Sequence, residues 1–136
     1  MGGAISDLVS RVNNLELLLK DKKSAFPTFS QRKRLMAYNE QNKENAILPT
    51  PVDGDNNVIF YTPEPGLLVA SVVWYKSATA TPALWVENAE LAHSRLNTEC
   101  SHCAIVVPTG TMVKCENVVT NYFFVDLYPL KSIMDS

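Results

Sequence analysis

Prolines and glycines interrupt the chain at short intervals from residue 46 onward. Proline fixes the backbone φ angle and lacks an N–H donor, so a helix of several turns does not fit between these breaks. The apolar runs that remain are rich in β-branched and aromatic residues, which is typical of strands bounded by turns. The sequence therefore predicts a mainly β domain. Its expected strands are Val58–Tyr61, Leu67–Tyr75, Ala83–Val86, Cys103–Val107, Met112–Val113 and Tyr122–Tyr128.

Two of these runs are apolar at both odd and even positions. They are Leu67–Tyr75 and Tyr122–Tyr128. Successive side chains of a strand point to opposite faces of the sheet, so this pattern predicts burial on both faces. A domain as small as residues 58–136 buries only about 60 to 65% of its unfolded surface. We therefore expect another subunit to cover one face.

A heptad pattern marks the amino-terminal end. Apolar residues recur there at alternating spacings of three and four, which is the seam of a coiled coil. An isolated helix of this length is marginal in water, so we expect it to form on association with copies of itself. The alternative is an amphipathic helix lying on its own domain, because Leu17 and Leu18 widen the apolar stripe. The seam residues are Ile5, Leu8, Val12, Leu15 and Leu19.

Charge and composition divide the chain into an arm and a head. Residues 1–45 carry eight Lys or Arg against five Asp or Glu, and residues 46–136 carry four against nine. We expect a coiled-coil stem over 1–23, a polar neck or linker over 24–57 and a β-sandwich head over 58–136. Within the neck, Arg32–Arg34 is interpreted as a solvated basic face.

The overall composition excludes two classes of protein. The net charge of −2 gives no positive field of the kind that nucleic-acid binders use. No apolar run approaches the roughly 20 residues that cross a bilayer, and the start lacks the parts of a signal peptide. We therefore expect neither nucleic-acid binding nor membrane insertion.

Four segments of the predicted head resemble a known family in their order. They resemble the carboxy-terminal heads of bacteriophage tail fibres and tail spikes, in which a D/P-Gly-x-Val-x-Val strand precedes a Leu-x-Val-Asn-Gly hairpin, a Val-Pro-x-Gly-x-x-Val turn and a closing Phe-x-Pro strand. The resemblance covers roughly residues 58–131. Ala89 departs from it by replacing the hairpin glycine. The segments are Gly66–Tyr75, Pro82–Ala92, Cys103–Val113 and Asn121–Leu130.

This resemblance implies a fold, an assembly and a role. Such heads resemble the tumour-necrosis-factor jelly roll, form homotrimers and follow a coiled-coil stem. The implied protein is a non-catalytic part of the virion, made in the host cytoplasm, that attaches to a bacterial surface glycan or protein. The alternative within the same fold is a structural trimerisation or collar module of a virion that binds no receptor.

The resemblance does not locate the receptor site. Aromatic rings stack on sugars and side-chain amides bind hydroxyl groups, but the same aromatic residues also suit a core or a trimer interface. The receptor-binding candidates are Tyr75, Trp85, Asn88, Asn121 and Tyr122.

The cysteines allow one further alternative, a zinc-stabilised module. Cys100 and Cys103, with His102 between them, have the ligand types of a zinc site. A second CxxC pair is absent from the sequence, so two cysteines at a strand end are the favoured interpretation.

There is no Gly-x-Ser-x-Gly elbow in the sequence. We expect no catalytic residues, no enzyme activity and no cofactor, and we expect Asp126 to be partly buried within its apolar strand.

The seam generates a first prediction. Leu15→Asp places a charge at a buried position without a partner, so we expect the stem to loosen and the oligomer to be less stable while the head stays folded. Light scattering should record a lower mass, and the melting temperature of the assembly should decrease. An unchanged mass together with an unchanged melting temperature would show that the seam is not an interface.

Overall fold

A computed structural model describes residues 6–13, 27–75, 80–95 and 99–131. The chain divides into two compact units, residues 29–130 and the two terminal segments. Residues 6–13 are helical, and their side chains are exposed. Of the predicted seam, Leu8 and Val12 are described and lie one turn apart, with 59% and 50% of their surfaces exposed. Ile5, Leu15 and Leu19 lie outside the described residues.

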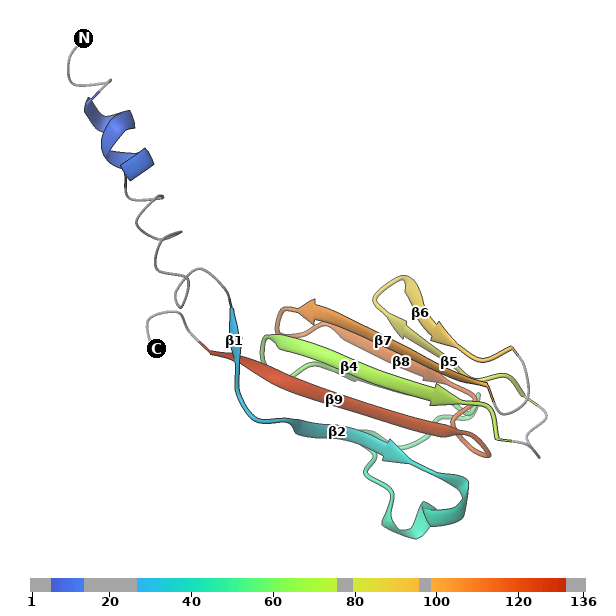
Figure 1. Cartoon of the computed structure of the whole chain (residues 1–136). Helices are drawn as coiled ribbons and strands as arrows, with labels where there is room; N and C mark the ends of the chain where they lie inside the picture. Colours follow the sequence, from blue (N-terminus) through green and yellow to red (C-terminus); the bar gives the residue numbers. More distant parts are fainter. Residues whose placement is uncertain (1–5, 14–26, 76–79, 96–98, 132–136) are drawn as a thin grey trace. The chain divides into compact units, whose positions relative to one another are not determined.

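Two antiparallel sheets form the larger unit (Figure 1). In the first sheet the strand order is β1-β9-β4-β7, and β2 also pairs with β9. In the second sheet the order is β3-β8-β5-β6. A short 3-10 helix, η1 (Glu40–Asn45), precedes β3. The strands are β1 (Thr28–Phe29), β2 (Lys33–Tyr38), β3 (Val58–Tyr61), β4 (Gly66–Val73), β5 (Ala83–Val86), β6 (Ala89–His93), β7 (Cys100–Val107), β8 (Met112–Glu116) and β9 (Tyr122–Lys131).

The core lies between the two sheets. Alternate residues of β4 and β9 point into it and are almost completely buried, and the second sheet contributes a matching set. This architecture confirms the predicted mainly β class and is consistent with a β-sandwich. The central core residues are Leu68, Ala70 and Val72 of β4, Phe123, Val125 and Leu127 of β9, and Val58, Phe60, Leu84, Val86, Val113 and Cys115 of the second sheet.

The outward residues of β4 and β9 are only partly buried in the single chain. Burial on both faces, expected from the apolar composition, is therefore not reached within one copy. Successive residues of β4 and β9 alternate between a buried face and a partly exposed face, because only one face of this sheet has a second sheet packed on it.

The predicted neck differs from the structure. Residues 33–38 form β2, which pairs antiparallel with β9 and belongs to the larger unit. Met36 is fully buried and Tyr38 is 5% exposed, so this strand completes the core. Its basic residues are paired: Lys33 forms an ion pair with Glu64, and Arg34 with Asp126. The larger unit spans residues 29–130, so β2 lies within it and not in a separate linker.

Gly66 generates a stability prediction. It begins β4 opposite Pro129, and a Cβ atom at this position would lie 2.3 Å from the Tyr128 carbonyl oxygen. Gly66→Ala therefore forces the backbones of β4 and β9 apart. We expect it to lower the free energy of unfolding in urea by about 1 to 3 kcal/mol.

Gly54 supplies the matched control for this measurement. A Cβ atom at Gly54 would meet nothing within 4 Å. Gly54→Ala should therefore change the free energy of unfolding by no more than about 0.5 kcal/mol. Equal effects of the two substitutions would contradict the close approach of β4 and β9.

Candidate functional site

Trp85 lies on the outer face of the second sheet. In β5 it sits opposite Lys114 of β8 and Glu90 of β6. The residue before it, Leu84, is fully buried, so the alternation of the strand directs Trp85 outward. We call the group around this indole the Trp85 face. It consists of Trp85, Glu87, Asn88, Glu90, His93, Arg95, Met112, Lys114 and Glu116.

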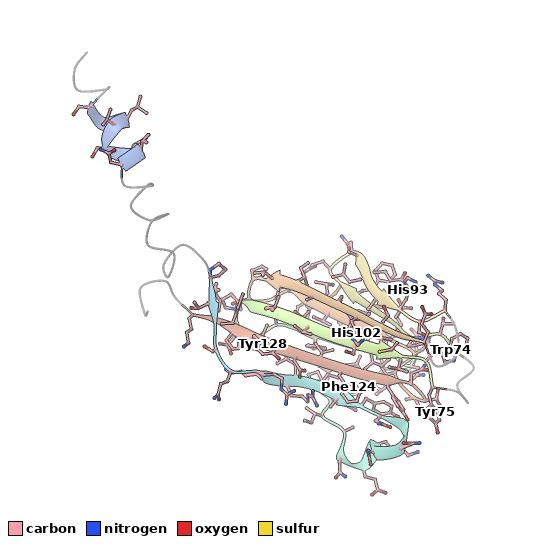
Figure 2. All side chains as sticks on the ribbon, in the orientation of Figure 1. Trp74, Tyr75, His93, His102, Phe124 and Tyr128 are labelled. Atoms are coloured by element: carbon pink, nitrogen blue, oxygen red, sulfur yellow. The ribbon has the colours of Figure 1, made fainter. Side chains whose placement is uncertain are left out.

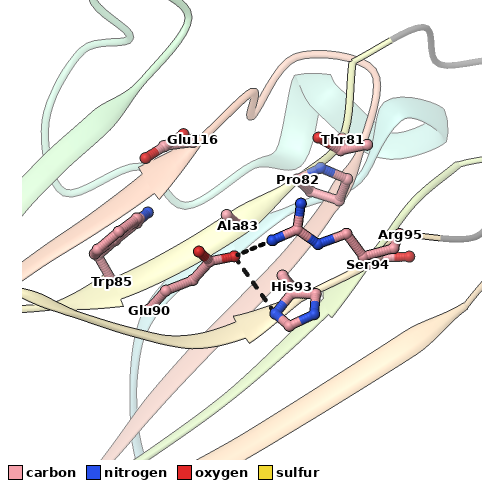
Figure 3. A pocket seen from close by; sticks show the side chains of 9 residues that line it. All are labelled: Thr81, Pro82, Ala83, Trp85, Glu90, His93, Ser94, Arg95 and Glu116. Carbon is pink, nitrogen blue, oxygen red and sulfur yellow. Dashed lines mark hydrogen bonds and ion pairs between the residues drawn. The ribbon is translucent and has the colours of Figure 1, made fainter.

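The first of two hollows beside Trp85 has a volume of about 120 Å³. Figure 3 shows Glu90, His93 and Arg95 grouped at this hollow, with Glu116 and Thr81 on its other side. One Glu90 oxygen, Oε1, lies 3.4 Å from both Arg95 Nη2 and His93 Nδ1. The hollow therefore presents carboxylates and cationic donors together.

The second hollow has a volume of about 250 Å³ and is lined by Trp85, Met112, Lys114 and the β5–β6 turn. Val86 pairs with Ala89, so this turn consists of Glu87 and Asn88. Glu87 has a φ angle of +53°, which L residues rarely adopt. Its backbone N–H donates to the Met112 carbonyl at 2.9 Å, and its Oε1 accepts from the Met112 N–H at 2.8 Å. These two bonds hold the turn in its left-handed conformation.

The Trp85 indole N–H is buried and has no hydrogen-bond partner among the described residues. Buried polar groups in proteins are nearly always paired, and a buried tryptophan N–H usually finds an acceptor. Trp85 thus combines a partly exposed ring with an unused donor, at a position shared by both hollows.

The five predicted receptor candidates fall into two groups. Trp85 and Asn88 line the second hollow together. Tyr75 and Tyr122 belong to the end of the first sheet, where their rings stack with centroids 5.2 Å apart. Asn121 is fully buried.

Asn121, one of the receptor candidates, is held inside the domain by hydrogen bonds. Its Oδ1 accepts from the Tyr75 N–H at 3.1 Å, and its Nδ2 donates to the carbonyls of Asn117 and Ala80 at 2.7 and 3.0 Å. A side chain with no exposed surface and with these bonds made is not available to a ligand.

Cys100 and Cys103 lie on opposite faces of β7, because three residues along a strand reverse the direction of a side chain. Cys100 is exposed, and its Sγ lies 3.3 Å from His102 Nε2, while His102 Nδ1 lies 2.8 Å from Ser71 Oγ. Cys103 packs against the core that contains Cys115. Among the described residues there is no group of three or more His, Cys, Asp or Glu able to hold a metal ion. The two cysteines of the predicted zinc alternative therefore lie on opposite sides of β7.

Burial sets the titration of the two inner cysteines. Desolvation raises the pKa of the Cys103 thiol, which also forms a hydrogen bond with the backbone of Ala70. Desolvation raises the pKa of the Cys115 thiol much further, and the neighbouring Cys103 adds to this shift. Cys115 donates to Met36 Sδ at 3.6 Å. Both thiols therefore remain protonated and serve packing at neutral pH.

A second surface, the outer face of the first sheet, is predominantly apolar. Figure 2 shows Phe124 and Tyr128 spaced along β9 with His102 on β7. Asp126 lies between the two aromatic residues with 13% of its side chain exposed, which confirms its predicted partial burial. We define this first-sheet face by Leu67, Val69 and Val73 of β4, Val106 of β7, and Tyr122, Phe124 and Tyr128 of β9.

One ion pair organises this first-sheet face. Arg34 donates from Nε and Nη2 to the two carboxylate oxygens of Asp126 at 2.8 and 3.1 Å. The guanidinium carbon also lies 5.4 Å from the centre of the Phe124 ring. The hydrogen bond to Asp126 raises the pKa of Arg34 further above its ordinary value. The charges are thus paired within the face and leave its apolar character dominant.

Sequence reasoning did not identify the charged residues of the Trp85 face. Glu90, Lys114 and Glu116 come from β6 and β8, and only the strand register brings them beside Trp85. The segment Glu87-Asn88-Ala89 was a local signal, since a short connection between two apolar runs indicates a hairpin.

Comparison of the chain with protein-family models, with curated proteins and with solved structures finds no match. No helix among the described residues is long and apolar enough to cross a membrane. A functional proposal therefore rests on the resemblance of sequence segments and on the geometry described above.

Asn121 generates the prediction of this section. Asn121→Ala removes the partners of buried backbone groups, so we expect the free energy of unfolding to fall by about 1 to 3 kcal/mol. Asn88→Ala, at the exposed hairpin tip, should change it by no more than about 0.5 kcal/mol. Urea denaturation of both variants measures the difference, and equal effects would contradict a structural role specific to Asn121.

Proposed function

We propose that this chain is the receptor-binding head of a bacteriophage tail fibre or spike, a homotrimer that attaches the virion to a bacterial surface glycan or protein. The observation that carries the proposal is the Trp85 face, where an aromatic ring stands between two hollows lined by polar side chains. Such a combination of one apolar contact and several directional polar groups is typical of recognition sites. The proposal assigns the head no catalytic role.

The order of the strands supports the jelly-roll part of this proposal. Counting β2 to β9 as strands one to eight, the first sheet runs one, eight, three, six and the second runs two, seven, four, five. Eight strands in two sheets, related by Greek-key connections, make up a jelly roll. Neighbours in each sheet are therefore mostly distant in sequence.

Two apolar surfaces support the homotrimer. Leu8 and Val12 of the seam are exposed on their helix, and the first-sheet face leaves the outward apolar residues of β4 and β9 only partly covered. Contiguous apolar surface of this kind commonly marks a protein interface. We assign both surfaces to contacts with two further copies of the same chain, because a heptad seam associates with its own kind.

A trimer would present three copies of the Trp85 face. Linked weak sites raise overall affinity by about 10² to 10⁴ when the geometry allows simultaneous contact. Shallow sites on an open sheet suit this arrangement, because each one needs only modest affinity. We thereby assign the Trp85 face of the second sheet to the receptor and the first-sheet face to the assembly.

Adhesion to cells tests the proposed function. The full chain, labelled at its amino terminus, is mixed with a panel of bacterial species and bound fluorescence is measured by flow cytometry. We expect saturable binding to at least one species, reduced at least tenfold by Leu15→Asp because avidity is lost. Binding to no species would overturn the receptor function and favour the collar module instead.

A further inference from the structure

We infer that the Trp85 face binds a neutral oligosaccharide, with one sugar ring stacked on the indole and its neighbours reaching into the two hollows. This inference rests on the proposed function and names the chemical class of its receptor. It is carried by the ring, the polar lining and the charge balance of the described residues.

The ring is held on a rigid support. Trp85 lies within β5, between β8 and β6, so the positions of its neighbours are fixed by strand pairing. Sites built on strands are more precise than sites built on loops. The C–H face of a pyranose is apolar and flat, so it packs against an aromatic face, while its hydroxyl groups project from the rim of the sugar toward polar side chains.

The polar lining suits groups that both donate and accept. The first hollow offers two carboxylates, Glu90 and Glu116, together with Arg95 and His93. A sugar hydroxyl donates to a carboxylate and accepts from a guanidinium at the same time. The contacts of Glu90 with Arg95 and His93 are long, at 3.4 Å, so a hydroxyl can insert between these partners or replace one of them.

The charge balance favours an uncharged sugar. The two cations on this face already have acidic neighbours: Lys114 Nζ lies 3.5 Å from Glu116 and Arg95 Nη2 lies 3.4 Å from Glu90. A third carboxylate, Glu87, stands at the rim of the second hollow. A phosphate, sulfate or sugar acid would meet these carboxylates, whereas a neutral sugar avoids like-charge repulsion.

The indole N–H adds an independent observation. It is buried without a partner among the described residues. A bound sugar brings hydroxyl and ring oxygens to the edge of Trp85, and a small rotation of the indole would turn this donor toward one of them. Ligand binding would thus supply the acceptor that no described residue provides to this N–H.

Intrinsic fluorescence provides the direct test. The chain has two tryptophans, so Trp74→Phe leaves Trp85 as the only reporter. An array of neutral hexose and N-acetylhexosamine oligosaccharides, with heparin fragments and oligosialic acid as charged probes, identifies a bound sugar. We expect at least one neutral probe to bind and to shift the Trp85 emission on titration. We expect the protein to bind the charged probes at least tenfold more weakly.

A matched pair of substitutions assigns the site. Trp85→Phe should weaken binding of the neutral probe, and Trp85→Ala should weaken it at least tenfold, while Trp74→Phe leaves it unchanged. Circular dichroism and the melting temperature check that each variant is folded. Binding that survives Trp85→Ala at full strength, or an array with no neutral ligand, would overturn the inference.

Chemical treatment of bound cells separates this inference from the proposed function. Periodate cleaves vicinal diols of surface glycans, and a protease removes surface proteins. Loss of adhesion after periodate but not after protease supports the oligosaccharide. Loss after protease alone overturns it and leaves the receptor function standing, whereas adhesion to no species overturns the proposed function.

Discussion

β4 pairs along its whole length with both β9 and β7, and this double pairing sets the register of the first sheet. Every residue of β4 has a partner on each side, from Gly66 opposite Pro129 and Val107 to Val73 opposite Tyr122 and Cys100. Because the side-chain period of a strand is two, this register assigns each residue either to the core or to the outer face. A slip by one residue would exchange the buried set with the half-exposed set.

Sequence pattern predicted the class and several strands, because apolar runs between prolines are local signals. Val58–Tyr61 and Ala83–Val86 were located with their observed bounds. β2 was missed, because its two core residues, Met36 and Tyr38, follow a basic run and their partners on β9 are distant in sequence. The same limit applies to the site: Trp85 and Asn88 were identified, but Lys114 was not, since tertiary pairing alone places it beside them.

The two outer faces of the sandwich differ in chemistry, and this difference supports the division of roles that we propose. The first-sheet face is predominantly apolar, and its carboxylate, Asp126, pairs with Arg34 and also lies 4.0 Å from Arg32. The Trp85 face carries one aromatic ring among carboxylates, cations and an amide. Burial of the first-sheet face between copies would orient three copies of the Trp85 face toward solvent, which is the arrangement that multivalent attachment requires.

The burial of the apolar first-sheet face, the packing of the seam and the avidity of weak sites all depend on assembly into a trimer. The most direct measurement is the mass of the full chain in solution by light scattering after size exclusion. We expect a trimer, with a mass of three chains across the concentration range at which cells are bound. A mass of one chain would contradict it, because the apolar face and the seam would then both remain in water.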